Sequence, residues 1–139
     1  MIQAVINNNI VLSSTIDSLS KIESFIDDVC ERYKFGMDNY GNILIALTEA
    51  VNNAITHGNK FDPTKNVDLH VETSDCGVLF IVKDEGDGFD FNNVPDPTLP
   101  QNIEKVDGRG VFLMKALSDT VDFENNGSVV KLNFFISTN

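Results

Sequence analysis

Apolar residues between positions 38 and 57 recur at spacings of three and four, as they do on the buried face of a helix. At ~100° per residue, these positions occupy an arc of roughly 140°. Asp38 is suited to cap the start of this helix, and Gly58 is suited to end it. The pattern predicts an amphipathic helix over 38–57 whose core-facing residues are Ile43, Leu44, Leu47, Ala50, Val51, Ala54 and Ile55.

Two neighbouring segments predict a β-hairpin. Residues 67–73 alternate strictly between apolar and polar, and residues 78–82 form an apolar run typical of a central strand. The turn-forming segment from Ser74 to Gly77 joins them. The other predicted elements are a strand at 2–12, a helix at 14–34, a loop at 89–107, a helix at 110–117, and strands at 119–124 and 128–136.

The order of these elements indicates the fold class. Strands come in pairs and helices are grouped, which favours an α+β two-layer sandwich with a mostly antiparallel sheet over a doubly wound parallel sheet. The loop at 89–107 contains Pro95, Pro97 and Pro100. A loop of this length in a compact domain is usually either functional, such as a lid, or disordered.

The net charge excludes some classes of partner. Ten basic residues against twenty-one acidic ones give a formal net charge of −11. Such a surface repels nucleic-acid phosphates and anionic membranes, whereas a basic protein partner would suit it. Cys30 and Cys76 form no metal motif or disulfide framework, so we interpret them as reduced, packed thiols. With neither a leader nor a membrane-spanning run in the sequence, we expect a cytoplasmic protein.

The polar face of the helix predicted at 38–57 carries the first candidate site. Glu49 and Asn53 are four residues apart and stack on one face, with Asn52 nearby and His57 one turn farther along. An Asn oxygen can coordinate Mg²⁺, and a carboxylate can accept a proton or orient a nucleophile at a phosphate. Alternatively, these residues only solvate the helix, since surface helices are usually polar on one side.

A second candidate site directly follows the predicted strand at 78–82. The segment from Asp84 to Gly88 reads DEGDG. A carboxylate at a strand end can accept a hydrogen bond from the exocyclic amine of adenine. Gly86 and Gly88 would let the backbone approach the ring without a Cβ clash. The alternative is an acidic, glycine-rich turn without a ligand.

A third candidate site precedes the helix predicted at 110–117. Gly108 and Gly110 flank Arg109, and two glycines at a helix N-terminus present free backbone N–H groups to an anion. The alternative is a helix start that needs only flexibility. In so acidic a chain, a triphosphate would depend on backbone amides, Mg²⁺ and a few cations. The cations nearest in sequence are Lys105, Arg109 and Lys115.

The order and spacing of the three motifs resemble the nucleotide-site motifs of the GHKL superfamily. Its members include the ATP-binding domains of DNA gyrase, the ninety-kilodalton heat-shock chaperone, histidine kinases and a mismatch-repair ATPase. Within it, the stretches TEAVNNAITHGN (48–59), DEGDGFD (84–90) and GRGVFLMKALSDTV (108–121) are similar to the bacterial anti-sigma-factor serine/threonine protein kinases. The resemblance spans about residues 38–135.

This resemblance implies a fold and a site. Residues 1–139 would form a single histidine-kinase-like ATP-binding domain, with helices covering one face of a mostly antiparallel mixed sheet. Glu49 would be the catalytic general base, Asn53 would bind Mg²⁺, Asp84 would recognise adenine, and residues 89–107 would form the ATP lid. The other cofactor-binding residues it implies are Asn52, Gly86, Gly88, Lys105, Gly108, Arg109, Gly110 and Val111.

Some matching positions receive no defined step. Asn52 and His57 match the helix motif, but neither is assigned a catalytic role, and His57 is equally suited to bonding carbonyls at the helix end. Arg109 stands where many superfamily members have a small or aliphatic residue. Its side chain would contact either phosphate or a protein partner.

The resemblance also implies a function. The protein would bind ATP and Mg²⁺, sequester a sigma factor, and phosphorylate a serine or threonine on an anti-sigma-factor antagonist, acting as a homodimer. Two alternatives stay open: an ATP-gated protein-binding regulator without kinase activity, and a histidine-kinase catalytic domain acting in trans. Against the latter, no helical hairpin with an acceptor histidine precedes the motifs, and His57 and His70 lie inside the ATP-binding region.

Overall fold

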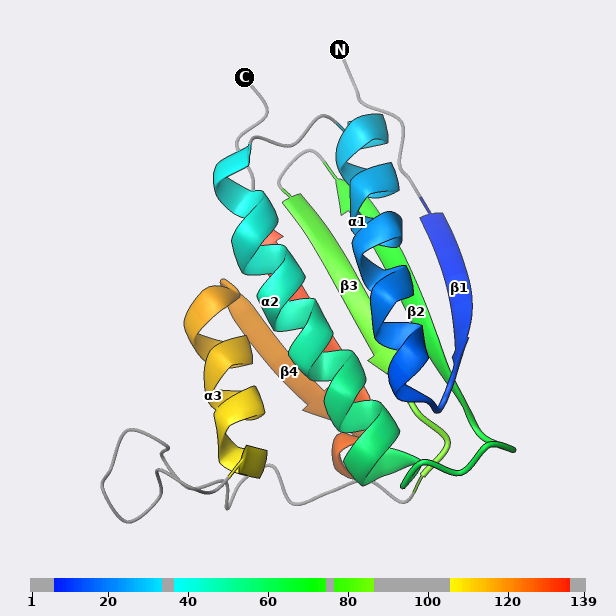
Figure 1. The fold of residues 1–139 in the computed structure, drawn as a ribbon. Helices are drawn as coiled ribbons and strands as arrows, with labels where there is room; N and C mark the ends of the chain where they lie inside the picture. Colours follow the sequence, from blue (N-terminus) through cyan, green and yellow to red (C-terminus); the bar gives the residue numbers. More distant parts are fainter. Residues whose placement is uncertain (1–6, 34–36, 75–76, 87–105, 136–139) are drawn as a thin grey trace.

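An antiparallel sheet forms one layer of the molecule. The computed structural model describes residues 7–33, 37–74, 77–86 and 106–135. Five strands in these ranges pair antiparallel, in the order β1-β2-β3-β5-β4 (Figure 1). Their bounds are β1 Asn7–Ser13, β2 Asn66–Ser74, β3 Gly77–Lys83, β4 Thr120–Glu124 and β5 Val129–Phe135.

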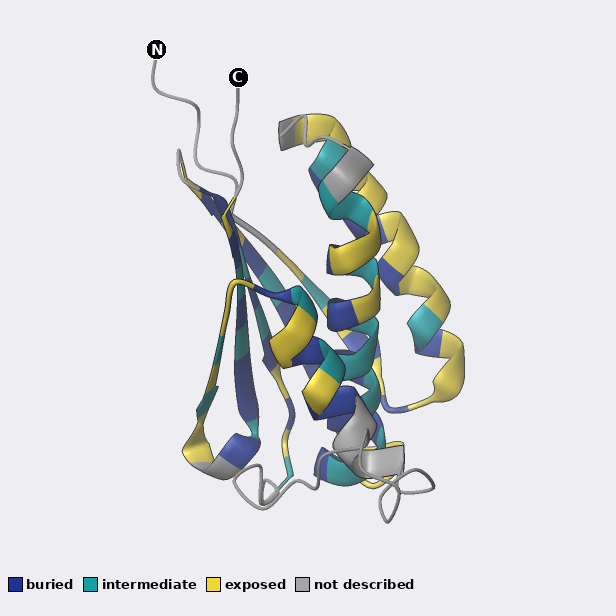
Figure 2. Ribbon diagram, turned by 90° about the vertical axis from the view of Figure 1, so that its left-hand side faces the viewer, coloured by how far each residue is buried: buried dark blue, intermediate teal, exposed yellow. Residues whose placement is uncertain are grey.

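Helices form the second layer, and α1, α2 and α3 all cover the same face of the sheet (Figures 1 and 2). The predicted α+β sandwich is therefore confirmed. The bounds are a 3₁₀ helix η1 Ile16–Leu19, α1 Ser20–Tyr33, α2 Met37–Asn53, a π-helix η2 Ala54–Gly58, α3 Val106–Leu117, and a short 3₁₀ turn η4 Asn125–Gly127.

The core lies between the two layers. On β2, Val67 and Leu69 are fully buried, whereas Asp68 between them is exposed, as strand alternation requires. The predicted hairpin is confirmed by the antiparallel pairing of β2 with β3. Phe80 on β3 packs edge-on against Phe25 of α1 and Phe134 of β5, with ring centroids 6.5 Å and 6.1 Å away.

Helix α2 buries the predicted apolar arc. Six of its seven positions are at most 5% exposed, and only Leu44 is partly exposed. The helix begins at Met37, so Asp38 lies within its first turn, whereas it was predicted to lie before it. The predicted end near His57 and Gly58 agrees with the structure, but the last turn, Ala54–Gly58, is the π-helix η2, which periodicity does not predict.

Helix α3 also differs from the prediction. It begins at Val106, so Gly108 and Gly110 lie within its first turns and not ahead of it. The helix predicted at 14–34 opens as the 3₁₀ turn η1 and becomes α-helical at Ser20. The predictions for residues 2–6, Gly36, Cys76 and most of the proposed lid (residues 89–105) lie outside the described residues.

Two further expectations can be compared with the structure. Cys30 is a half-buried free thiol that packs against the core, as a small apolar group would. Burial and the neighbouring Asp27 raise the pKa of this thiol to about 11. Among the described helices, none has the length and apolar character needed to cross a membrane.

Candidate active site

Helices α2 and α3 meet closely at Gly110. A Cβ built on Gly110 would lie 3.1 Å from Glu49 Oε2 and 3.2 Å from both Oδ1 and Nδ2 of Asn53. Any side chain at position 110 would therefore press on the two polar groups. The contact places the glycine of the third motif directly against the helix motif, although nearly 60 residues separate them in sequence.

Asn53 has the properties of a ligand-binding group. It is only 5% exposed, and its Oδ1 and Nδ2 both lie 3.2 Å from the Cβ position of Gly110, where α2 and α3 meet. An amide oxygen suits Mg²⁺, which typically takes one or two protein ligands together with phosphates and waters. Among the described residues, no group of three or more His, Cys, Asp or Glu side chains is placed to hold a metal ion.

The π-helix η2 follows Asn53 and packs against the second candidate motif, which begins at Asp84. Its wider turn is closed by the backbone N–H of Asn59, which donates to Ala54 O at 2.8 Å. Thr56 Oγ1 donates to Asn52 O at 2.8 Å within the same turn. Such π-turns inside helices often occur at functional sites. Here the turn brings Gly58 against the Asp84 carboxylate.

Asp84 is a buried carboxylate at the end of β3. Its N–H donates to Ser128 O at 2.9 Å, and its Oδ1 accepts the Gly86 N–H at 2.8 Å. Asp84 as a whole is only 6% exposed. Burial raises the pKa of the Asp84 carboxyl, while the Gly86 hydrogen bond and the charge of Lys65 act in the opposite direction. A buried acceptor of this kind would be well suited to an amine donor from a ligand.

Two glycines allow the strand motif to pack against the end of η2. A Cβ on Gly58 would lie 2.3 Å from Asp84 Oδ2, and a Cβ on Gly86 would lie 1.8 Å from the Gly58 carbonyl oxygen. Neither distance is possible for a real side chain. Glycine is therefore required at position 86, where the clash is with backbone, whereas a side chain at position 58 would displace the Asp84 carboxylate. The sequence analysis expected Gly86 to let the backbone approach a bound base, which stays a prediction, and expected Gly58 only to end a helix. The contact between Gly58 and Gly86 was not predicted.

The structure describes only some of the remaining predicted site residues. Asn52 and His57 are half-buried on α2 and η2. The Val111 side chain is 2% exposed and belongs to the core, which leaves its backbone as the part available to a ligand. Gly88, Lys105 and the side chain of Arg109 fall outside the described part of the chain.

The earlier start of α3 changes the expected role of its glycines. The first N–H groups of an α-helix lack intrahelical partners, and Gly108 lies among them. Gly110 is the fifth residue of the helix, where the N–H normally bonds a carbonyl of the preceding turn. Gly110 therefore contributes by lacking a side chain, which leaves room for Glu49 and Asn53. Lys115 lies exposed in the last turn, at the helix end away from these glycines.

Sequence reasoning missed two contributors, Asn59 and Ser128. Asn59 is 1% exposed and hydrogen-bonds the Glu85 N–H, while the Ser128 carbonyl holds Asp84. Asn59 was part of the motif stretch, but its role depends on contacts across the fold. The only available signal was an asparagine next to a glycine at the helix end.

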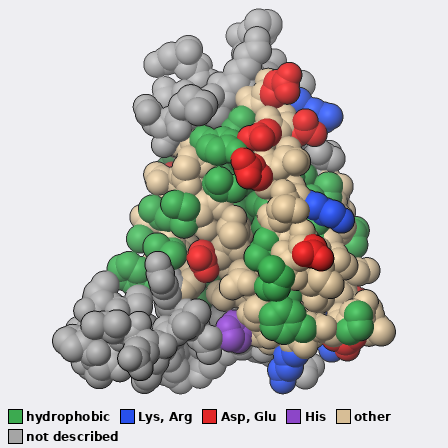
Figure 3. Space-filling model, in the orientation of Figure 1, with side chains coloured by type: hydrophobic (Ala, Val, Ile, Leu, Met, Phe, Trp, Pro, Cys, Tyr) green, Lys and Arg blue, Asp and Glu red, His purple; other side chains and the backbone are tan. Residues whose placement is uncertain are grey.

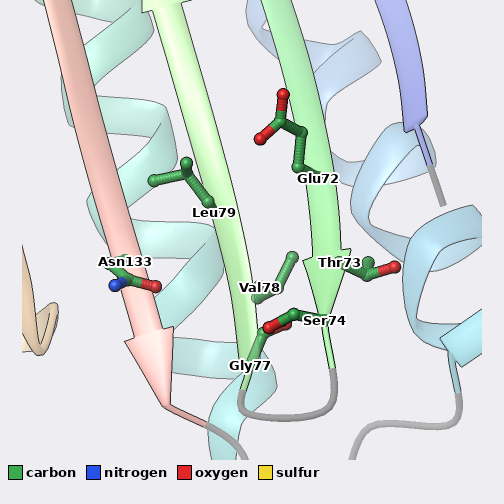
Figure 4. A pocket seen from close by; sticks show the side chains of 7 residues that line it. All are labelled: Glu72, Thr73, Ser74, Gly77, Val78, Leu79 and Asn133. Atoms are coloured by element: carbon green, nitrogen blue, oxygen red, sulfur yellow. The ribbon is translucent and has the colours of Figure 1, made fainter. Parts of the chain in front are cut away.

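A separate depression of about 400 Å³ lies on the other face of the sheet (Figure 4). The side chains of Glu72, Leu79 and Asn133 line it beside the β2–β3 turn. Gly77 and Asp84 stand at opposite ends of β3, roughly 20 Å apart at the usual rise per residue. This depression is therefore not part of the site formed by α2, α3 and Asp84.

Comparison with known proteins identifies the family. Residues 12–134 match the model of the histidine kinase-like ATPase domain family. The serine-protein kinase RsbW of Bacillus subtilis is 31% identical, over 75% of this chain and 69% of its own length. RsbW of Bacillus licheniformis is 27% identical, over 81% of this chain and 74% of its own. RsbW of Staphylococcus aureus is 24% identical, over 88% and 82%.

A solved structure shares the fold. The RsbU and RsbW domains of a Mycobacterium tuberculosis protein superpose with a TM-score of 0.67 and 17% identity, over 96% of this chain. This chain spans 33% of that one. From the family match and the identity to RsbW, we conclude that the chain belongs to the histidine kinase-like ATPase domain family, among the anti-sigma-factor serine kinases.

Proposed function

We propose that this protein is an ATP-dependent serine/threonine protein kinase that also acts as an anti-sigma factor. One observation carries the proposal: three segments distant in sequence meet at one end of α2. Glu49 and Asn53 lie against Gly110, and η2 lies against Asp84 and Gly86. Kinship with proteins named as serine-protein kinases supports the reaction type.

In this proposal, ATP binds with adenine at Asp84 and its phosphates toward the start of α3. The buried Asp84 carboxylate accepts the exocyclic amine, and the glycine contacts of the loop allow the ring to approach the backbone. Gly108 would offer a helix N-terminal N–H to phosphate. Asn53 would hold Mg²⁺, which neutralises phosphate charge when bound. Gly88, Lys105 and Arg109 remain predicted ligand contacts.

Glu49 is the proposed catalytic residue. Phosphoryl transfer depends mainly on alignment and charge neutralisation, so the protein needs only to orient the incoming hydroxyl. Glu49 is half-buried on the same helix face as Asn53 and one turn before it. From there its carboxylate would accept the hydroxyl proton of a serine or threonine aligned with the γ-phosphate.

The proposed partners are proteins. They are a sigma factor, bound in the ATP state, and an anti-sigma-factor antagonist that supplies the phosphorylated serine or threonine. Figure 3 shows acidic side chains over α1 and α2, in keeping with the net charge of −11. This charge favours partners with basic surfaces over nucleic acid. We further propose one domain over residues 1–139, a homodimer and a cytoplasmic location.

A phosphotransfer assay tests the proposal. The protein is incubated with γ-labelled ATP, Mg²⁺ and an antagonist protein from the same cell, with Glu49→Gln as the inactive variant. Acid-stable label on an antagonist serine or threonine, absent with Glu49→Gln, is the expected result. Acid-labile label on histidine would contradict it and indicate histidine-kinase chemistry. ATP binding without any transfer would instead support an ATP-gated binding regulator.

A further inference from the structure

Asn59 is a fully buried polar residue directly after η2. It is 1% exposed, and its carboxamide makes three hydrogen bonds. Oδ1 accepts the Glu85 N–H at 2.8 Å, while Nδ2 donates to Asn66 O at 3.0 Å and to Ser14 Oγ at 2.9 Å. These partners come from three different segments of the chain.

The orientation of this carboxamide follows from its partners. A backbone N–H can only donate and a carbonyl can only accept, so Oδ1 must face Glu85 and Nδ2 must face Asn66. Ser14 Oγ donates to Lys65 O at 2.6 Å, which leaves its lone pairs to accept from Asn59. The buried network is satisfied throughout, and such networks specify one arrangement of the groups they join.

The network holds the loop that carries Asp84. Glu85 lies between Asp84 and Gly86, and its N–H is bound to Asn59. Its side chain also accepts the backbone N–H of Asn66. The loop is therefore attached to the segment after η2 through both backbone and side chain. Because Gly58 contacts the Asp84 carboxylate directly, the same short segment fixes the carboxylate from two sides.

We propose that Asn59 is a positioning residue of the nucleotide site, acting through Glu85 to aim the Asp84 carboxylate at the base. Asn59 is too buried to touch a ligand itself. This inference rests on the proposed function, since it presupposes that Asp84 reads adenine. It assigns base selectivity partly to a residue outside the ligand contacts.

The test compares ATP with inosine triphosphate, which carries a carbonyl in place of the exocyclic amine. Affinities for both are measured by calorimetry, with Mg²⁺, in the wild type, Asn59→Ala and Ser14→Ala, well below each unfolding midpoint. Ser14→Ala is the matched control because it disrupts the same network without touching the Glu85 bond. We expect both variants to unfold at lower temperature.

The ratio of the two affinities distinguishes positioning from stability alone. We expect Asn59→Ala to reduce the preference for ATP about three- to tenfold, the worth of a hydrogen bond, while Ser14→Ala keeps the wild-type preference. An unchanged preference in Asn59→Ala would overturn this inference alone. A wild type that binds neither nucleotide, or does not distinguish them, would overturn both this inference and adenine recognition by Asp84. If Asn59→Ala does not fold, the ratio of the two affinities is measured in Asn59→Ser, with the same expected and contradicting results.

Discussion

At the scale of single residues, the site is built from polar groups that the fold keeps from water. Asp84 and Asn53 are each less than 10% exposed. Burying such groups lowers stability unless something compensates. Ionisable groups with shifted pKa values cluster at functional sites, and a ligand-binding role is proposed here for both Asp84 and Asn53.

The raised pKa of Asp84 predicts a pH dependence in the nucleotide-free protein. A carboxyl whose folded pKa exceeds its unfolded value binds its proton more tightly when folded. Its contribution to the free energy of unfolding is therefore lost as the pH rises from the unfolded value of 3.8 through the folded pKa. Asp84→Asn has no such loss, so we expect its stability relative to wild type to increase across that window.

Urea unfolding of both proteins from about pH 4 to about pH 7 measures this difference. The urea midpoint of Asp84→Asn minus that of wild type should increase with rising pH and then become constant. A difference that decreases as the pH rises would mean that the folded protein stabilises the Asp84 carboxylate. Burial would then not be the dominant influence on this group.

Glu49 is predicted to act in transfer and not in binding. Glu49→Gln removes the proton acceptor but keeps the shape of the side chain. We expect the affinity for Mg·ATP to stay within about twofold and phosphotransfer to fall about 10²- to 10⁴-fold. The exposed Glu72, on the other face of the sheet, provides the control variant Glu72→Gln, which should keep full activity. Loss of nucleotide binding in Glu49→Gln would show a structural role instead.

At the scale of elements, the packing of α3 on α2 determines the site. Gly110→Ala would press on Glu49 and Asn53, whose contacting atoms lie at the ends of side chains that can move. Alanine also favours the helix by ~1 kcal/mol. We therefore expect unchanged or higher thermal stability, with phosphotransfer reduced about tenfold or more by the displaced groups.

Gly41→Ala is the matched control for this substitution. Gly41 lies within α2, and a Cβ there would meet nothing within 4 Å. It should gain ~0.5–1 kcal/mol, or about 2–4 °C, with wild-type transfer. If Gly110→Ala were equally active, contact between the two helices would be irrelevant to the reaction.

Elements with strong periodicity could be predicted from sequence, and those shaped by tertiary contact could not. The buried arc of α2 and the β2–β3 hairpin follow from local pattern alone. The π-helix η2, which puts Gly58 against Asp84, and the start of α3 at Val106 could not be predicted from local pattern. The roles of the motif residues stay predictions, although the structure places Glu49, Asn53 and Gly110 together. The supporting role of Asn59 could not be predicted, since its three partners are far apart in sequence.

At the scale of the whole molecule, the two layers place the candidate site at one end of the helical face. The segment directly after β3 contributes Asp84, α2 contributes Glu49 and Asn53, and α3 contributes Gly110. A ligand bound there would contact elements from both layers and would stabilise the folded state as a whole. In a chain of net charge −11, this stabilisation has to overcome repulsion of a triphosphate.

Thermal unfolding with and without Mg·ATP, in wild type and in Asp84→Asn, tests the central claim most directly. Ligand at ~100-fold above Kd adds ~2.7 kcal/mol, which corresponds to a rise on the order of 5–10 °C for a domain of this size. We expect this rise in wild type and its loss in Asp84→Asn. No rise in wild type at millimolar nucleotide, or an equal rise in both proteins, would contradict an adenine nucleotide site at Asp84.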